Sequence, residues 1–415
     1  MLYPAELSGQ YQPTGLEFWV RVGFNHTMIV IKPLHLLVLI TFCLLGQAAN
    51  AGQSNPIALR IATFNIEDVR SSDLDTPDNP RLKEIAAIIQ RMRPNVLLLS
   101  EIAIRQDDST SNADRFVELY LSVSQGDGLR PIAFDTYTPA SNTGIHSGFD
   151  LDNSGAITLS IPEQTPTQTD AGRAYGNDCF GFGAFPGQYA MALLVNPKLT
   201  IQTGQIRTFQ RFLWKDLPNH HAPTNIDGSA WYSPEEWDAF RLSSKNFVDV
   251  PILLPNGSTL HALISHPTPP AFDGREGRNK RRNHDEIMLI RNYIDNNQDL
   301  YDDQGRIGGL EADSSFVIMG DLNADPSDGS ALELVMVTQI LISKRLAKDV
   351  FPSSDITIDR LDQTDTAMFR LRVDYVLPSK DITITKSGVW RMNDSDKEKE
   401  FPSDHFPVWI EAIVP

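Results

Sequence analysis

The sequence contains little cysteine. Only two of its 415 residues are cysteines, Cys43 and Cys179. Cys43 belongs to an N-terminal segment that we expect to be removed, which excludes an intramolecular disulfide in the rest of the chain. We expect Cys179 to be a small packed thiol, and we expect a large core or a bound metal ion, rather than disulfides, to stabilise the fold.

Basic residues are also in short supply. The chain has 53 Asp and Glu against 36 Lys and Arg, which gives a formal net charge of −17 at pH 7. An acidic surface repels phosphate backbones at long range, and this argues against loose, salt-driven binding of nucleic acid. It does not exclude a nuclease whose cleft is neutralised locally by a metal ion.

The hydrophobic stretch at 34–45 is too short for a comfortable membrane span. It follows Lys32 and precedes small residues that end at Ala49-Asn50-Ala51, which is the pattern of a secretory signal peptide. We expect 1–51 to be an upstream segment and signal peptide, with the signal at about 28–51, and an exported protein in the periplasm or medium. An N-terminal membrane anchor is the alternative. Because Met28 is a second candidate start, 1–51 is left out of the fold prediction.

The remaining chain, 52–415, is typical of one globular domain. Its opening alternates strand, helix and strand at 58–68, 79–94 and 95–102. Further strands are expected at 188–196, 246–254, 258–266, 314–321, 372–378, 387–392 and 407–414, and further helices at 281–297 and 331–346. Many strands, few helices and no evident linker predict two sheets packed face to face with helices outside, a single α/β sandwich.

A long insertion is expected at about 122–240. Residues 122–188 are rich in Gly, Pro, Ser, Thr and Asp, which predicts surface loops apart from the strand at 188–196. Residues 204–240 hold three of the six tryptophans, Trp214, Trp231 and Trp237. This aromatic segment is expected either to line a substrate rim or to pack as a cover.

Polar residues repeatedly follow or interrupt the predicted strands. They are Asn65 after IATF, Glu101 after LLLS, His266 after ALIS, Asp321 and Asn323 after VIMG, Asp374 within RVDYVL, and Asp404 and His405 before PVWI. Loops beside strand ends are where sheet proteins place their sites. Taken singly, Asn65 also reads as a turn residue and His266 as a structural histidine. Asp374 is less ordinary, because a carboxylate inside a strand is costly unless it is paired, and a histidine is a natural partner.

Five motifs in order carry a specific resemblance to a known family. They are TFNIE, LLLSE, GDLNADP, RVDYVLPS and SDHFPV, and they are similar to motifs of the endonuclease/exonuclease/phosphatase superfamily of deoxyribonuclease-like, metal-dependent phosphoesterases. The resemblance spans 58–414, and QYAMALLVN, SHPTPPAFDG and RNHDE resemble exported bacterial members. It implies a four-layered α/β/β/α sandwich of two mostly antiparallel sheets flanked by helices, with the site at the top of the sheets.

The resemblance also implies roles for the residues at the strand ends. Glu101 and Asn65 resemble the family's metal ligands, with Asp404 toward the metal and water, and their oxygen atoms suit Mg²⁺, Mn²⁺ or Ca²⁺. Asp321 looks like the carboxylate that positions or deprotonates the attacking water. If the chain is extended there, Asn323 points the same way as Asp321 and contacts the phosphate or that carboxylate.

The remaining implied roles concern the phosphate and the leaving group. His405 resembles the histidine on the scissile phosphate, and the pattern assigns its orientation to Asp374 rather than to Asp404. His266 matches a second histidine that protonates the leaving oxygen. Tyr189 is either a phosphate contact or a buried strand tyrosine. Arg241, Ser244 and Lys245 lie where relatives place a phosphate-binding arginine, with Arg241 and Lys245 as our candidates. The basic run at 275–286 is either a clamp for an anionic substrate or a solvated helix start.

These observations predict a metal-dependent hydrolase of phosphate esters, with a nuclease or related phosphodiesterase as the first hypothesis. The alternatives are a phosphomonoesterase or a lipid-headgroup phosphodiesterase, whose pocket or membrane-facing rim the insertion would build, and a non-catalytic binding module on the same fold. The expected partner is a phosphate-ester substrate, with no protein partner and no stable membrane span in the mature chain.

Overall fold

The computed structural model describes residues 55–107, 110–348, 351–391 and 401–415. Residues Asn55–Pro415 form one compact unit. The predicted signal peptide at 28–51 and the upstream residues 1–27 lie outside the described residues. Among the helices of the described segments, none has the length and apolar character needed to cross a membrane.

The first sheet holds both ends of the compact unit. Its strand order is β11-β12-β1-β2-β4-β3. The strands are β1 Ile57–Val69, β2 Val96–Ile102, β3 Asp135–Tyr137, β4 Met191–Val195, β11 Thr383–Val389 and β12 Val408–Val414. Only β1 and β2 are parallel. Helix α2, Pro80–Met92, connects them, as parallel neighbours require a crossover.

The second sheet repeats this arrangement. Its order is β10-β9-β8-β7-β5, with β6 also paired to β7. The strands are β5 Thr200–Ile201, β6 Arg207–Thr208, β7 Phe247–Leu253, β8 Thr259–Ser265, β9 Ser315–Asp321 and β10 Asp374–Pro378. Again only one pair of strands is parallel, β8 and β9. Helix α6, Arg278–Ile294, connects these two strands. The expected mostly antiparallel sheets are therefore present.

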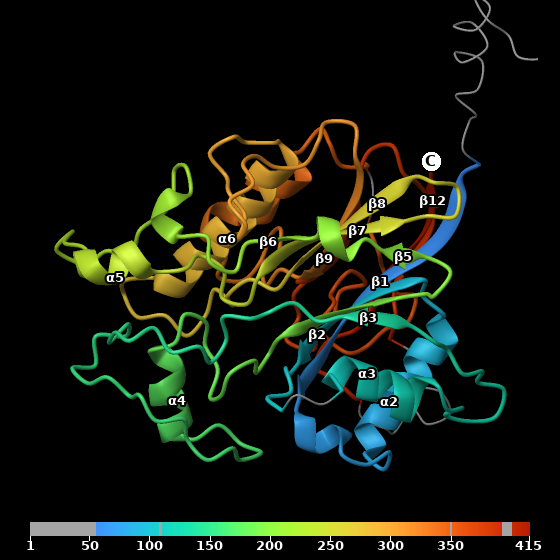
Figure 1. Cartoon of the computed structure of the whole chain (residues 1–415), viewed down its shortest axis with the longest axis horizontal. Coiled ribbons are helices and arrows are strands. Elements are labelled where there is room, and N and C mark those ends of the chain that lie inside the picture. Colours follow the sequence, from blue (N-terminus) through green and yellow to red (C-terminus); the bar gives the residue numbers. More distant parts are fainter. Residues whose placement is uncertain (1–54, 108–109, 349–350, 392–400) are drawn as a thin grey trace, which may run out of the picture. The chain divides into compact units, whose positions relative to one another are not determined.

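Three hydrophobic clusters separate four layers. The first lies between the sheets and joins Leu98 and Ile410 of one sheet to Ile264 of the other. The second packs α6 on the outer face of the second sheet, and the third packs α2 and α3, Asn112–Phe116, on the outer face of the first. Figure 1 shows α2 and α3 on one side of the strands and α6 on the opposite side. The predicted four-layered α/β/β/α sandwich is confirmed.

Local sequence explains where α2 lies. The Asn79 side chain caps its first turn by accepting from the N–H groups of Arg81 and Leu82, and Pro80 is at a position that needs no N–H donor. The stripe of Leu82, Ile85 and Ile89 is fully buried. This apolar face holds the helix on the sheet.

Some predicted elements differ from the structure. The single helix expected at 331–346 is instead the 3₁₀ turn η5, Leu332–Leu334, and the π-helical segment η6, Met336–Leu341. Glu333 and Leu334 have positive φ values of 53° and 48°, which no continuous right-handed helix permits. The strand predicted at 387–392 ends at Val389, and the predicted loops at 122–188 contain β3 and helix α4, Asp170–Asn177.

Short elements complete the fold. They are η1 Ser71–Leu74, η2 Val117–Leu121, η3 Thr203–Gln205, η4 Trp214–Asp216 and α5 Pro234–Ala239. The aromatic segment at 204–240 packs chiefly as a cover, because Trp214 is fully buried in the core beneath α6 and Trp237 packs against the same core. Trp231 also lines a surface pocket, which is described below.

Candidate active site

The ends of both parallel strand pairs meet at one site. Asn65 pairs with Ser100 where β1 and β2 run side by side, and Glu101 follows directly. In the other sheet, Asp321 at the end of β9 pairs with Asp374 at the start of β10. The carboxyl ends of parallel strands converge on one edge, so the polar residues that follow them are brought together.

Asn65 joins the two sheets. Its side-chain amide lies 3.1 Å from Glu101 Oε1 and 3.1 Å from Asp321 Oδ2. The N–H of Asp68 donates to Glu101 Oε2 at 3.0 Å, and Asp68 is placed there by a register shift in β1 between Asn65 and Val69. Glu67 and Asp68 have positive φ in this irregular stretch. The bulge thus turns the strand so that its backbone contacts Glu101.

His405 is held by Asp374, as the sequence predicted. Its Nδ1 lies 2.8 Å from Asp374 Oδ2, and its Nε2 lies 3.8 Å from Asp321 Oδ2. Burial disfavours the charged imidazole, but the carboxylates of Asp374 and Asp321 raise the pKa of His405 to about 10. Asp404 Oδ1 lies farther away, 3.8 Å from His405 Nε2, and its side chain is 47% exposed, so the hydrogen bond that orients His405 is the one to Asp374.

His266 approaches Asp321 from the other side. Its Nε2 lies 3.5 Å from Asp321 Oδ2, and its Nδ1 has no hydrogen-bond partner among the described residues. Burial, with a further contribution from Lys245, lowers the pKa of His266 well below its ordinary value. A buried neutral imidazole with an unused ring nitrogen is available to exchange a proton with a ligand.

Asn323 does not extend the strand as we expected. Its φ is 52°, so the chain turns at this residue instead of pointing 321 and 323 the same way. The N–H of Asn323 donates to Asp321 Oδ1 at 2.9 Å, and its side-chain amide donates to the carbonyl of Pro267 at 3.2 Å. Asn323 therefore fixes Asp321 and the loop that carries His266.

Buried charge concentrates at this point of the fold. Burial raises the pKa of Asp321 to about 7 and also raises that of Glu101. Burial lowers the pKa of Lys245, while Glu286, Glu101 and Asp321 act in the opposite direction. Perturbed groups that gather beside strand ends are typical of functional sites.

Lys245 is supported by a residue that the sequence did not single out. Its Nζ donates to the carbonyl of Pro267 at 3.4 Å. The carboxylate of Glu286, on α6, accepts the N–H groups of Ser244 at 2.5 Å and Thr268 at 2.6 Å. Glu286 thus ties the loop of Lys245 to the loop that follows His266. It belongs to the quoted RNHDE motif, which was the available signal.

Of the other predicted residues, Arg241 lies apart from this cluster, whereas Tyr189 lies beside its acidic residues. Arg241 donates to Asn142 Oδ1 at 2.7 Å and lies over the Phe180 ring, so its described contacts are structural. Tyr189 has a φ of 59°. Burial and then the charges of Asp68 and Glu101 raise its pKa, which places its hydroxyl in an acidic environment.

Asp68 is the clearest site residue that sequence reasoning missed. Besides its contact with Glu101, it pairs with Arg70 at 2.6 Å and accepts from Gln188 Nε2 at 3.1 Å. Its only sequence signal was that it directly follows the TFNIE motif.

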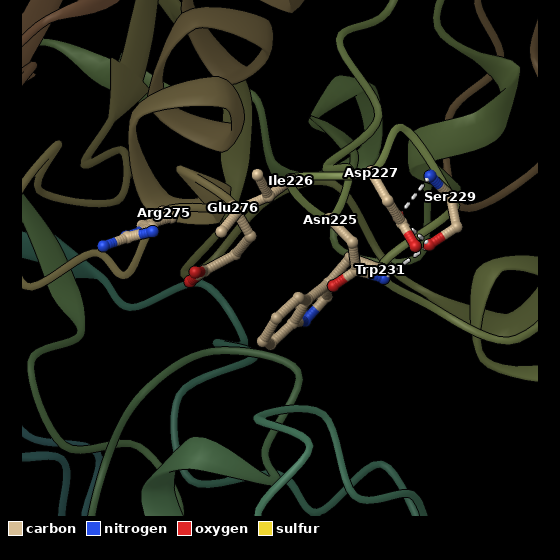
Figure 2. Close-up of a pocket in the computed structure, with 7 residues that line it drawn as sticks. All are labelled: Asn225, Ile226, Asp227, Ser229, Trp231, Arg275 and Glu276. Carbon is tan, nitrogen blue, oxygen red and sulfur yellow. Dashed lines mark hydrogen bonds between the residues drawn. The ribbon is translucent and has the colours of Figure 1, made fainter.

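The basic run at 275–286 is largely committed to structure. Arg282 is buried and donates to the carbonyls of Leu242 and Phe180, and Arg278 donates to that of Leu151. Arg275 and Glu276 instead line a separate pocket of about 420 Å³ with Asn225, Ile226, Asp227, Ser229 and Trp231. Figure 2 shows Trp231 and the Arg275–Glu276 pair at this pocket, which includes none of the buried catalytic candidates.

The donor set of the main cluster suits a hard divalent cation. The carboxylates of Glu101 and Asp321 both accept from Asn65 Nδ2 and so lie close together, and Asp321, Asp374 and His405 each offer an atom within 4.8 Å of the others. A cation would offset the cost of keeping Glu101 and Asp321 ionised while buried. Carboxylate and amide oxygens are the ligands that Mg²⁺, Mn²⁺ and Ca²⁺ prefer.

The chain is similar to several solved structures. Among solved structures, an endonuclease/exonuclease/phosphatase from Beutenbergia cavernae is 14% identical, with a TM-score of 0.46 and coverage of 86% of this chain and 72% of that one. A family protein from Bacteroides thetaiotaomicron is 14% identical (TM-score 0.45, coverage 87% and 99%), and the catalytic domain of human Nocturnin with bound sulfate is 13% identical (TM-score 0.44, coverage 86% and 94%).

No curated protein matches the chain. The model of the Endonuclease/Exonuclease/phosphatase family, however, matches residues 62–405. This span includes every candidate residue from Asn65 to His405. The chain therefore belongs to the Endonuclease/Exonuclease/phosphatase family, whose members are phosphoesterases.

Proposed function

We propose that this protein is a divalent-metal-dependent hydrolase of phosphate esters, and specifically a phosphodiesterase or nuclease that uses in-line attack by water. The observation that carries the proposal is the position of Asp321. Its carboxylate is buried, contacts the amide of Asn65, and lies 3.5 Å from His266 and 3.8 Å from His405. One carboxylate flanked by two imidazoles supports proton transfer and anion binding at a single point.

The residues divide the work by position. Asp321, fixed by the N–H of Asn323, orients and deprotonates the attacking water. His405, held by Asp374, donates from Nε2 to the phosphate oxygens. His266, whose ring is kept neutral by burial, would serve the leaving oxygen after taking up the proton that the water loses to Asp321, 3.5 Å away. Lys245 adds positive charge for the phosphate. Glu101 and Asn65, with Asp404 at the exposed edge, would hold Mg²⁺, Mn²⁺ or Ca²⁺, which when bound polarises the phosphoryl oxygen.

The alternative is a phosphomonoesterase or lipid-headgroup phosphodiesterase. We also propose export to the periplasm or medium, which rests on residues 28–51 alone.

The test is hydrolysis by His405→Ala and Glu101→Ala across plasmid DNA, RNA, bis-p-nitrophenyl phosphate, p-nitrophenyl phosphate and sphingomyelin, with Mg²⁺, Mn²⁺, Ca²⁺ or EDTA. We expect each variant to lose about 10²- to 10⁴-fold in kcat/KM on the preferred substrate, and EDTA to abolish wild-type turnover. His261→Ala is the matched control. His261 Nδ1 lies 2.8 Å from Asp249 Oδ1, and this pair is outside the site. Near-wild-type hydrolysis by either site variant would show the assignment to be wrong, and no turnover on any substrate would favour the binding-module alternative.

A further inference from the structure

A second group of metal-ligating side chains lies outside the active site. His221 follows η4 in the aromatic segment, His284 is on α6, and Glu333 is in η5. One ligand atom from each lies within 4.8 Å of the other two, and His221 Nε2 lies 4.0 Å from Glu333 Oε1. None of the three has a role in the proposed phosphate chemistry.

A single buried carboxylate orients both histidines. Asp285 Oδ1 lies 2.8 Å from Nδ1 of His221 and 3.0 Å from Nδ1 of His284. Its other oxygen accepts the indole N–H of Trp214 and the backbone N–H of His221, each at 2.6 Å.

These contacts fix the tautomer of each ring. An ionised carboxylate only accepts hydrogen bonds, so both Nδ1 atoms carry the proton. In each neutral ring the lone pair is then on Nε2. His284 is 1% exposed, and its Nε2 has no hydrogen-bond partner among the described residues. Burying a nitrogen lone pair without a hydrogen-bond donor costs free energy, and a bound metal ion would offset that cost.

We propose that His221, His284 and Glu333 bind a borderline divalent metal ion of the Zn²⁺ type. Two imidazole nitrogens and one carboxylate oxygen form a ligand set that suits Zn²⁺ better than Mg²⁺. Histidine ligands of zinc usually donate their other N–H to a carboxylate, which is the role of Asp285. With three protein ligands, water completes the coordination.

The geometry needs only a small adjustment. Ligand atoms in a tetrahedral zinc site lie about 3.3 Å apart, against 4.0 Å between His221 Nε2 and Glu333 Oε1 and at most 4.8 Å between any two ligand atoms of the group. The side chain of Glu333 is 60% exposed and is free to move inward, whereas Asp285 holds both histidines at Nδ1. The bound ion would cross-link the segment after η4, helix α6 and η5.

Zinc binding is measured by titration calorimetry on the full, chelator-treated protein with excess Mg²⁺ present. We expect the wild type to bind one equivalent of Zn²⁺ at least tenfold more tightly than His221→Ala or Glu333→Gln. Two matched controls should bind like the wild type. His220→Ala removes the adjacent histidine, whose Nδ1 instead contacts the carbonyl of Leu217, and Glu235→Gln removes an exposed acid of α5.

Two further measurements show whether zinc binds at the His221 cluster or at the active site, and neither depends on phosphoesterase activity. Zn²⁺ should raise the unfolding temperature of the wild type and of Glu101→Gln, but not of His221→Ala. Co²⁺ should give a visible absorption band that His221→Ala and Glu333→Gln lose. If the bound zinc is lost in Glu101→Gln and kept in His221→Ala, the ion occupies the active site and the proposal is wrong. Equal binding by the wild type and both cluster variants would also overturn it.

Discussion

At the scale of single residues, Asp374 shows how a buried carboxylate can set the chemistry of its neighbour. It is 1% exposed and lies 2.8 Å from His405 Nδ1. With a pKa of about 10, His405 carries a proton on both ring nitrogens. The Nδ1–H donates to the carboxylate of Asp374, which fixes the plane of the ring and leaves the Nε2–H for the phosphate. In that orientation Nε2 faces Asp321 and the proposed phosphate.

Replacing Asp374 by Asn should therefore reduce turnover more than substrate binding. The amide keeps the size of the side chain but offers His405 either a donor or a weaker acceptor. We expect kcat to fall about 10²- to 10³-fold, within the usual range for a positioned acid or base, with KM nearly unchanged. Steady-state kinetics on the preferred phosphodiester measure both constants.

The control for this prediction is Asp249→Asn. Asp249 is 2% exposed and also pairs with a histidine, His261, at 2.8 Å, so the substitution disturbs a similar buried pair outside the site. It should lower stability and leave the kcat of the folded enzyme close to the wild-type value. Equal losses of kcat in the two variants would mean that Asp374 acts on folding and not on His405.

Some contacts of the candidate site could be predicted from individual residues of the sequence, and others could not. That Asp374 needs a partner was predictable, because it is an acid within an apolar strand, and the resemblance to the family implied that this partner is His405. Asp68 was not, because a bulge with positive φ brings it to Glu101. Glu286 was not either, because it accepts N–H groups from two distant loops, and such contacts exist only after the chain has folded.

At the scale of elements, α2 depends on its first turn as well as on its apolar face. Asn79 accepts hydrogen bonds from the N–H groups of Arg81 and Leu82, which would otherwise lack partners within the helix. Its own amide donates to Asp73 Oδ1 at 3.2 Å. The cap therefore links α2 to η1, next to the strand that carries Asn65.

Asn79→Ala should lower the free energy of unfolding by about 0.5–2 kcal/mol. Asn79→Ser is the matched control, since a serine oxygen can accept the same N–H groups, and we expect it to recover most of that loss. Denaturant unfolding followed by circular dichroism gives both values. If alanine and serine destabilise the protein equally, the cap contributes nothing and packing of the apolar face alone holds the helix.

The segment at 331–346 shows where element prediction failed. Its apolar residues recur as in a helix, yet the backbone turns left-handed at Glu333 and Leu334. Val335, Val337, Thr338 and Ile340 are β-branched and have lower helix propensity. Val335, Met336 and Ile340 are fully buried, but Leu334 and Val337 remain 46% and 43% exposed, so only part of the apolar surface is buried. Periodicity alone does not report this competition between backbone and packing.

At the scale of the whole molecule, the layers were predictable because they follow from strand and helix order. The β1-α2-β2 and β8-α6-β9 units each bury a parallel pair under one helix. The inter-sheet core then brings Asn65 and Asp321 together from the two sheets. The sequence pattern did not predict which loops cover the sheets. Trp214 is buried in the core beneath α6, whereas Trp231 lines a surface pocket.

The net charge of the whole chain should govern the rate at which long, anionic substrates reach the active site. The net charge is −17, and Arg278 and Arg282 of the main basic run are bound to backbone carbonyls. The screening length falls from about 30 Å at 0.01 M salt to about 8 Å at 0.15 M. We therefore expect kcat/KM for plasmid DNA to rise several-fold over this range at constant Mg²⁺.

Bis-p-nitrophenyl phosphate is the control in that titration. It carries a single negative charge, so its kcat/KM should change less than about twofold as long-range repulsion is screened. A protein with a basic nucleic-acid groove behaves in the opposite way, because salt weakens its phosphate contacts. A fall in kcat/KM for DNA with rising salt would contradict the prediction, and it would mean that a local basic surface outweighs the acidic charge of the molecule.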